Sequence, residues 1–333
     1  MTQAIGIHRV LIAQPIDPLA TGVLEELGFV VRSASSTDLK VLTAKLHWAD
    51  ALVVRNLRVD QRMLQGASDL KVVGVHGVGT DAIDLPAATG AGVIVFNTPD
   101  SNYQSVAEHT IALLLALAKQ LLPACDALRS GHYAFRYVAK PIELDGKTFG
   151  VVGFGRVGRA VARLASGIGM RIVVFPSARA DLSSVPEDYR IVSELDMLLA
   201  VADVVSLHVP LTVETRGIID ARRLSLMKNS ALLLNTARGA LVDADALVMA
   251  LRNGEIAGAG IDVFTEEPVP ADHPLLRLER VIVTPHLGGS TDGALRRAAI
   301  SIVEGIACAA RGEIPVATIN VSAWENARRR ILG

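Results

Sequence analysis

The stretch Thr148-Phe-Gly-Val-Val-Gly-Phe-Gly-Arg-Val-Gly158 decides the fold of this chain. Its first half predicts a buried strand, and residues 157–166 predict a helix. Between them, Gly153 permits a tight turn, Gly155 lets the backbone approach a pyrophosphate, and Gly158 allows close helix–strand packing. The stretch therefore predicts a dinucleotide-binding unit, in which the free N–H groups of a helix N-terminus face phosphates. The alternative is a turn that serves packing alone.

A second glycine-rich turn, Gly77-Val-Gly79-Thr-Asp-Ala82, also follows an apolar run and competes for the same role. Asp81 and Asp84 would stand at the mouth of this turn and repel a pyrophosphate, whereas Arg156 in the first turn would attract one. We therefore assign the cofactor to the first turn. The N–H groups of the second turn are predicted to hold a small anion such as a carboxylate.

Short apolar runs alternate with helical segments along the whole chain. Most of the runs are apolar throughout, which is typical of parallel strands buried on both faces. Strand–helix repetition with right-handed crossovers predicts a doubly wound α/β fold. The expected strands are 10–13, 51–55, 71–75, 93–96, 148–152, 171–175, 204–207, 231–235, 258–263 and 281–284. The expected helices include 18–27, 157–166, 244–253 and 291–310.

The segment Ser105-Val-Ala-Glu108 matches a helix capping box, and residues 111–122 after it are apolar nearly all round. Such a helix must be buried, in part against another subunit. Pro123 is expected to interrupt it. Residues 131–141 are expected to be an irregular linker before the next strand.

Composition excludes several classes of protein. The chain has 333 residues, which predicts two domains, and it is 50% hydrophobic with a net charge of −1. This balance excludes disorder and disfavours nucleic-acid binding. No apolar run approaches the roughly 18–20 residues of a membrane span, and no secretory signal begins the sequence. Two cysteines, Cys125 and Cys308, and no Cys/His cluster predict a reduced, cytoplasmic protein without a metal site.

Three chemically useful side chains follow apolar strands in the second half. These are Arg238, Glu267 with its neighbour Glu266, and His286. Because ligands bind at the carboxyl ends of strands in such sheets, the three can converge. Arginine would grip a substrate carboxylate, histidine would exchange a proton, and the carboxylate would orient the imidazole. The alternatives are a surface or capping arginine, a solvated acidic turn and a loop histidine.

The strand after the first glycine turn ends in Val174-Phe-Pro-Ser-Ala-Arg179. NAD enzymes usually carry an acidic residue here for the ribose 2′-hydroxyl, and this chain has none before Asp181. Ser177 and Arg179 are therefore candidates for a 2′-phosphate, and we predict that NADP(H) is tolerated and preferred over NAD(H). The alternative is that Arg179 is solvated and NAD(H) binds weakly.

A set of motifs in fixed order resembles the D-isomer-specific 2-hydroxyacid dehydrogenases. The motifs are Asn97-Thr-Pro99, Ser105-Val-Ala-Glu-His109, Gly153-Phe-Gly-Arg-Val-Gly158, His208-Val-Pro-Leu-Thr212, Asn235-Thr-Ala-Arg-Gly239, Asp262-Val-Phe-Thr-Glu-Glu-Pro268 and Thr284-Pro-His-Leu-Gly-Gly-Ser-Thr291. The resemblance implies two Rossmann-like domains with a cleft between them. Residues 1–103 with 291–333 would form the substrate domain, and residues 104–290 the nucleotide domain, through which the family dimerises.

The resemblance also implies roles for individual residues. Arg238, Glu267 and His286 would be catalytic, and the substrate would contact Val78, Gly79 and Arg55. The cofactor, NAD(H) or NADP(H), would be lined by Gly153, Gly155, Arg156, Val157, Gly158, His208, Pro210, Thr215, Thr236, Ala237, Asp262 and Gly288. Ser177 and Arg179 join this set on their own chemistry, as the candidates for a 2′-phosphate.

The expected reaction is hydride transfer between a nicotinamide cofactor and a small D-2-hydroxy acid. The 3-phosphoglycerate/3-phosphohydroxypyruvate pair leads, with glyoxylate or hydroxypyruvate reduction as the alternative. Val75 stands where phosphoglycerate-type members carry arginine, and Arg55, Arg58, Arg136 and Lys140 are candidates for a phosphate. A C-terminal regulatory domain is expected to be absent, because the sequence ends at Gly333. A dinucleotide-sensing corepressor of the same fold is the alternative from another class, but it usually needs long flanking tails.

Overall fold

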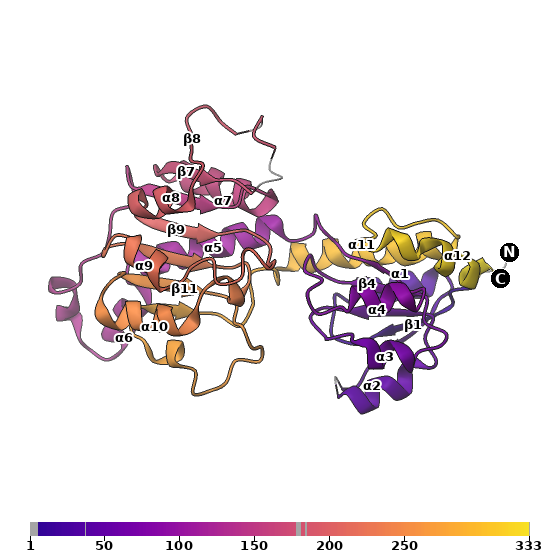
Figure 1. Ribbon diagram of the computed structural model, residues 1–333. Helices are drawn as coiled ribbons and strands as arrows, with labels where there is room; N and C mark the ends of the chain where they lie inside the picture. Colours follow the sequence, from indigo (N-terminus) through magenta and orange to yellow (C-terminus); the bar gives the residue numbers. More distant parts are fainter. Residues whose placement is uncertain (1–5, 37, 178–180, 184, 333) are drawn as a thin grey trace. The chain divides into compact units, whose positions relative to one another are not determined.

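The computed structural model describes residues 6–36, 38–177, 181–183 and 185–332. The chain divides into two compact units (Figure 1). The first unit comprises Met1–Asn102 and Gly289–Gly333, and the second comprises Tyr103–Gly288. The chain therefore leaves the first unit, builds the second, and returns to complete the first.

The first unit is a parallel sheet with helices on both faces. Its strand order is β2-β1-β3-β4-β5. Residues alternate along each strand, so that Val10 and Ile12 pack under α1, α11 and α12, whereas Leu11 packs under α2, α3 and α4. The strands are β1 Arg9–Ile12, β2 Val30–Ser33, β3 Ala51–Val54, β4 Val72–Val75 and β5 Ile94–Phe96. The helices are α1 Leu19–Glu26, α2 Leu39–Leu46, α3 Gln61–Gln65, α4 Leu85–Gly90, α11 Asp292–Ala310, η4 Val321–Ala323 and α12 Trp324–Leu332.

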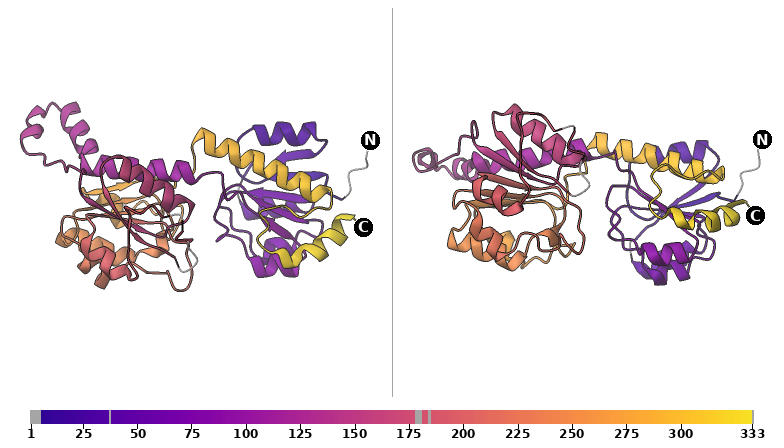
Figure 2. Two further views of the ribbon diagram at one scale, coloured as in Figure 1. Left: turned by 90° about the horizontal axis from the view of Figure 1, so that it is seen from above. Right: turned by 45° about the horizontal axis from the view of Figure 1, so that its top comes forward.

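The second unit is a larger parallel sheet of the same kind. Its order is β12-β11-β10-β9-β6-β7-β8, with α5 and α7 on one face and α8, α9 and α10 on the other (Figures 1 and 2). The strands are β6 Thr148–Val152, β7 Arg171–Phe175, β8 Arg190–Ile191, β9 Val204–Leu207, β10 Leu232–Asn235, β11 Gly258–Ile261 and β12 Val281–Val283. The helices are α5 Tyr103–Ala118, α6 Leu121–Arg129, η1 Tyr133–Tyr137, α7 Arg156–Gly167, α8 Leu195–Val201, α9 Ala221–Leu226, η2 Gly239–Leu241, α10 Ala244–Asn253 and η3 Pro274–Arg277.

The strand order of the second unit reverses between β6 and β9, which are neighbours although β7 and β8 lie between them in sequence. The carboxyl ends of strands on either side of such a reversal leave a crevice where ligands bind. The glycine turn that follows β6 lies at this point. The predicted class, two doubly wound parallel-sheet α/β units, is confirmed.

Each predicted strand corresponds to an observed one, but two strands, β2 and β8, were not predicted. Both are edge strands, and their side chains are mostly exposed. A strand that buries neither face has no reason to be apolar throughout, so its sequence carries no such signal.

Two predictions about the apolar helix were wrong. The helix α5 begins at Tyr103, so Ser105 lies inside its first turn instead of capping it, and its Oγ donates to the carbonyl of Gly288 at 2.6 Å. The chain breaks at Gln120, whose φ is +51°, and not at Pro123. Pro123 lies in the first turn of α6, where a missing N–H costs nothing.

Among the described residues, no single helix is long and apolar enough to cross a membrane. Only α5 and α6 taken together would pass by length and composition, and they meet at a bend of 57°.

Candidate active site

The glycine turn between β6 and α7 has the geometry of a phosphate cradle. Gly153 has φ +95°, and a Cβ there would lie 2.8 Å from the carbonyl oxygen of His208. A Cβ on Gly158 would lie 2.1 Å from the oxygen of Gly153, so this glycine serves packing. By contrast, a Cβ on Gly155 would meet nothing within 4 Å.

The absent side chain of Gly155 therefore leaves open space in front of the α7 N-terminus. Gly155 is also the N-cap residue, and no side chain caps the first turn of α7. Arg156 and Val157 begin the helix, and Arg156 is exposed. Open space, uncapped N–H groups and a cationic side chain suit a pyrophosphate, so the residues present fit a dinucleotide.

The loop after β9 forms the other wall of the turn. His208 N donates to the carbonyl of Val152 at 2.7 Å, and its ring Nε2 pairs with Ser206 Oγ at 2.8 Å. Its Nδ1 is buried without a hydrogen-bond partner among the described residues. Burial lowers the pKa of His208 to about 3, so the ring is neutral at physiological pH. Further along, Thr215 Oγ1 donates to the carbonyl of Pro210 at 2.7 Å and closes the loop.

The turn after β10 presents Arg238. Asn235 shapes this turn, because its Nδ2 donates to the carbonyl of Arg238 at 2.9 Å and its Oδ1 accepts from Ala237 N at 3.1 Å. The Arg238 guanidinium donates to the carbonyl of Ala237 at 2.6 Å. A Cβ on Gly239 would lie 2.1 Å from the carbonyl carbon of Phe264, so this turn packs directly against the segment that leads to Glu267. Beside it, Thr236 Oγ1 pairs with Thr110 of α5 at 2.8 Å.

The structure brings Glu267 and His286 together. Glu267 Oε2 lies 2.8 Å from His286 Nδ1, and its Oε1 accepts from Phe264 N at 3.0 Å. Burial alone would raise the pKa of Glu267, but these two hydrogen bonds hold it below its ordinary value. The carboxylate is therefore ionised and orients the ring, while 44% of the His286 side chain stays exposed to a small molecule.

His286 occupies a strained turn that Asp262 holds in place. Its φ is +53°, a conformation that costs a non-glycine residue about 1–3 kcal/mol. The carboxylate of Asp262 accepts from Leu287 N at 2.8 Å and from Gly288 N at 2.9 Å, and its main-chain carbonyl accepts from His286 N at 2.9 Å. Burial would raise the pKa of Asp262, yet the hydrogen bonds it accepts hold the pKa below its ordinary value. The predicted contact of Asp262 and Gly288 with a cofactor stays a prediction.

The predicted substrate residues Arg55, Val78 and Gly79 belong to the first unit. The Arg55 guanidinium donates to Ser290 Oγ at 3.1 Å, and burial lowers the pKa of Arg55. The carbonyl of Val78 accepts from Asn97 Nδ2 at 2.7 Å, while its side chain is exposed. A partly desolvated guanidinium of this kind gains from pairing with an anion.

Other predicted residues are dispersed. The side chain of Asp84 caps α4, which supports our choice against the second glycine turn for the cofactor. Arg58 is exposed in the first unit, whereas Arg136 and Lys140 are exposed in the second, where Arg136 lies over the rings of Tyr133 and Tyr137. Ser177 follows β7 and is half-buried, and Arg179 lies outside the described residues.

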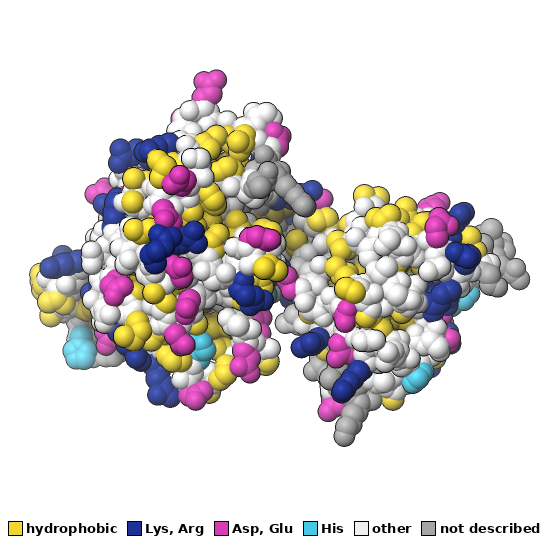
Figure 3. Space-filling model, in the orientation of Figure 1, with side chains coloured by type: hydrophobic (Ala, Val, Ile, Leu, Met, Phe, Trp, Pro, Cys, Tyr) yellow, Lys and Arg dark blue, Asp and Glu magenta, His cyan; other side chains and the backbone are white. Residues whose placement is uncertain are grey.

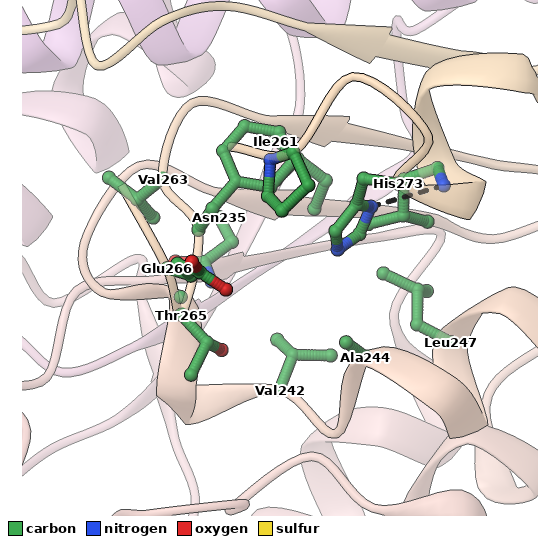
Figure 4. Close-up of a pocket in the computed structure, with 13 residues that line it drawn as sticks. Asn235, Val242, Ala244, Leu247, Ile261, Val263, Thr265, Glu266 and His273 are labelled. Carbon is green, nitrogen blue, oxygen red and sulfur yellow. Dashed lines mark hydrogen bonds between the residues drawn. The ribbon is translucent and has the colours of Figure 1, made fainter. Parts of the chain in front are cut away.

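A separate cavity of about 220 Å³ is lined by residues next to those of the site in the sequence, and Figure 4 shows its walls. Its walls include Gly239 and Glu266, the chain neighbours of Arg238 and Glu267, but not those two residues themselves. Glu266 thus faces this mostly apolar cavity, together with Val242, Leu247 and His273. The geometry separates the two adjacent glutamates, since only Glu267 contacts His286.

Asn235, Thr284 and His109 have positioning contacts that the sequence argument did not assign. Asn235 had a signal, because a polar residue that ends a buried strand shapes the turn after it. His109 and Thr284 are 175 positions apart, and the sequence around neither residue predicts their contact.

Residues 111–288 match the family model described as "D-isomer specific 2-hydroxyacid dehydrogenase, NAD binding domain". Among curated relatives, D-3-phosphoglycerate dehydrogenase of Methanocaldococcus jannaschii is 41% identical over 318 residues, covering 94% of this chain and 59% of the relative. The chain thus spans about three fifths of the length of that relative. The glyoxylate reductase of Thermofilum pendens is 39% identical over 267 residues, covering 79% of this chain and 78% of the relative.

A solved structure shows the same fold. It is an NADPH-dependent glyoxylate/hydroxypyruvate reductase from Sinorhizobium meliloti, in complex with NADP and malonate. It superposes with a TM-score of 0.83 at 30% identity, covering 95% of this chain and 98% of that chain.

Proposed function

Because this chain belongs to the D-isomer-specific 2-hydroxyacid dehydrogenase family, we propose that it moves a hydride between a nicotinamide dinucleotide and a small D-2-hydroxy acid. The observation that carries the proposal is the hydrogen-bonded pair of Glu267 and His286, close in the fold to the Arg238 turn. When bound, the nicotinamide ring supplies or accepts the hydride.

In the proposed reaction, each of these three side chains has one task. Glu267 accepts a hydrogen bond from His286 Nδ1, so Nε2 is the nitrogen left to exchange a proton with the substrate oxygen. In reduction, the protonated ring gives its Nε2 proton to the developing alkoxide, and in oxidation the neutral ring takes the hydroxyl proton. Arg238 holds the substrate carboxylate through two parallel hydrogen bonds.

The leading substrate pair is 3-phosphoglycerate and 3-phosphohydroxypyruvate, supported by relatives with that activity in their names. The second candidate is glyoxylate or hydroxypyruvate reduction. It is favoured by the similarity to a glyoxylate reductase over most of that relative's length and by Val75, which is buried and apolar where phosphoglycerate-type members carry arginine.

The test is a panel of keto acids with NADH and NADPH: phosphohydroxypyruvate, hydroxypyruvate, glyoxylate, pyruvate and a branched 2-keto acid. We expect turnover with at least one of them, and the highest kcat/KM identifies the substrate class. Absence of turnover across the panel would overturn the proposal and favour a dinucleotide-sensing binding protein.

For the cofactor, we propose a preference for NADP(H). Pro176 and Ser177 follow β7 where an acidic residue would repel a 2′-phosphate. Pro176→Asp should restore that repulsion and shift the kcat/KM ratio toward NADH. A wild-type protein that strongly prefers NADH would contradict the proposed NADP(H) preference, but it would not contradict the proposed hydride transfer.

We also propose that the chain forms a homodimer through the projection made by α6 and η1. Neither element has a buried residue, and the projection stands out from the second unit (Figure 2). Its exposed apolar residues are Leu121, Leu122, Leu128, Tyr133, Tyr137 and Val138, and apolar side chains gather there (Figure 3).

In analytical ultracentrifugation, Leu121→Glu/Leu128→Glu should produce a monomer. Val316→Glu, at an exposed site in the first unit, should remain a dimer. The cytoplasmic location stays a prediction.

A further inference from the structure

Two side chains on one face of α5 reach the loop that carries His286. Ser105 and His109 are four residues apart, so both point to the same side of the helix. Ser105 Oγ donates to the carbonyl of Gly288 at 2.6 Å. His109 Nε2 lies 2.9 Å from Thr284 Oγ1 and 3.2 Å from Asp262 Oδ1. These contacts lie on both sides of His286 in the loop 284–288.

The hydrogen-bond directions in this cluster are fixed by chemistry. Asp262 is ionised and can only accept, so Thr284 Oγ1, which lies 2.5 Å from its Oδ1, donates to it. Because the single hydroxyl hydrogen of Thr284 is donated to Asp262, Thr284 Oγ1 must accept a hydrogen bond from His109. The Nε2 of His109 therefore carries a hydrogen and serves as the donor that completes the cluster.

The cluster is most deeply buried at the carboxylate of Asp262. The Asp262 side chain is 1% exposed, and the His109 side chain is 20% exposed. Because Asp262 is almost fully buried, water does not replace a lost hydrogen-bond donor. A carboxylate that has lost one donor is expected to shift its remaining hydrogen-bond partners. Those partners are Thr284 Oγ1 and the amides of Leu287 and Gly288, which lie before and after the strained His286.

We propose that His109 is a positioning residue for the reaction: it donates to Thr284 and Asp262 and so holds the His286 turn in its catalytic conformation. This inference rests on the proposed function of His286. His109 touches neither Glu267 nor Arg238 in any contact that the described residues show. Its effect is therefore expected on proton transfer and not on the grip of the substrate carboxylate.

The test compares three variants of the full-length chain. His109→Leu removes the donor, and His109→Gln keeps an Nε2 donor at a similar reach. Glu108→Gln changes an exposed neighbour on α5 that accepts a hydrogen bond from Gln104. For reduction of the best keto acid, we expect His109→Leu to lower kcat about tenfold to hundredfold, with the KM of the cofactor within twofold. The glutamine variant at 109 should recover most of the loss, and Glu108→Gln should match the wild type.

A second readout needs neither cofactor nor turnover. Hydrogen–deuterium exchange of the ligand-free protein, followed by mass spectrometry, should show faster exchange of peptides spanning 284–290 in His109→Leu. Peptides elsewhere should be unchanged, and His109→Gln should exchange like the wild type. This arm still decides the inference if the wild type proves inactive, in which case only the proposed function fails.

Three results would overturn the inference. One is a His109→Leu kcat within twofold of the wild type. Another is an equal loss in the leucine and glutamine variants, which would mean that ring packing and not donation matters. The third is faster exchange throughout the second unit, which would make His109 a general stabiliser.

Discussion

At the scale of single residues, two adjacent glutamates have different surroundings. The two carboxylate oxygens of Glu267 accept hydrogen bonds from the Phe264 amide and His286, whereas Glu266 lines the separate cavity. The same substitution, glutamate to glutamine, can therefore be made at Glu267, which contacts His286, and at Glu266 as a matched control.

We predict that Glu267→Gln lowers kcat for keto-acid reduction by about tenfold or more, because the charge that favours a protonated imidazole is lost. The high-pH limb of the pH–rate profile should move to lower pH for the same reason. In the wild type, activity should also fall in acid as Glu267 takes a proton, below the ordinary carboxyl range. Glu266→Gln is the control; an unchanged profile in Glu267→Gln, or an equal effect of both, would contradict the assignment.

Arg238 provides a second prediction at this scale. Arg238→Lys replaces a planar fork with a point charge, so the two parallel hydrogen bonds to a carboxylate cannot both form. We expect kcat/KM for keto acids to fall about tenfold to hundredfold, with little change in the Kd of the cofactor. Isothermal titration with the cofactor supplies that Kd, and losses of similar size in both quantities would assign Arg238 to the cofactor instead.

At the scale of elements, the turn between β6 and α7 contains glycines with separable tasks. A Cβ on Gly158 would strike the Gly153 carbonyl, one on Gly155 would enter open space before the helix, and one on Gly167 would meet nothing within 4 Å. The three positions lie in or next to a single helix, which makes their alanine variants comparable.

We predict that Gly158→Ala destabilises the protein by about 1–3 kcal/mol through overpacking. Gly155→Ala should leave stability nearly unchanged but weaken dinucleotide binding. Gly167→Ala should stabilise slightly, by about 0.5–1 kcal/mol. Urea unfolding and cofactor titration of the three proteins check this, and a Gly155 variant that binds normally would mean that phosphates do not use the turn.

What the sequence predicts at this scale depends on burial. The strands that lie under helices on both faces, such as β3 and β4, are apolar throughout and were predicted. The edge strands β2 and β8 were missed because their side chains face water. The capping-box prediction failed for another reason: α5 begins at Tyr103, and the Ser105 hydroxyl bonds to Gly288, a partner 183 residues away that no local pattern encodes.

The candidate site shows the same division. Glycine spacing and residue type predicted the cradle, and residue type after buried strands predicted Arg238, Glu267 and His286. Residue type alone did not separate Glu266 from Glu267, because which of two neighbours faces the histidine depends on the path of the loop; the resemblance pointed to Glu267, and the contact with His286 agrees with it. His109 stands in one of the motifs, but its contacts could not be predicted, since its partners Thr284 and Asp262 follow strands that are distant in the sequence.

At the scale of the whole molecule, several buried or half-buried carboxylates in both units are stabilised by ion pairs with cationic side chains or by hydrogen bonds from N–H groups. In the first unit, Asp50 is ion-paired with Arg9 and Lys71; burial would raise its pKa, but these partners lower it strongly. Asp203, Asp262 and Glu267 in the second unit also have lowered pKa values for the same balance of causes.

A carboxylate whose pKa is lower when folded stabilises the fold above its ordinary pKa and loses that contribution as pH falls. We therefore predict that the melting temperature is steady from pH 7 to about 5 and falls steeply below about 4. Asp50→Asn should lower the melting temperature at pH 7 and flatten this acid dependence. A wild-type curve that does not respond to acid would contradict the burial and pairing described for these carboxylates.

We propose above all that His286, oriented by Glu267, is the proton donor in the reduction of a 2-keto acid. The most direct measurement is kcat of His286→Gln against wild type with the best keto acid of the panel, together with the Kd of the reduced cofactor by fluorescence titration. We expect kcat to fall by about 10²–10⁴ with an almost unchanged Kd. A variant that turns over like the wild type would contradict it.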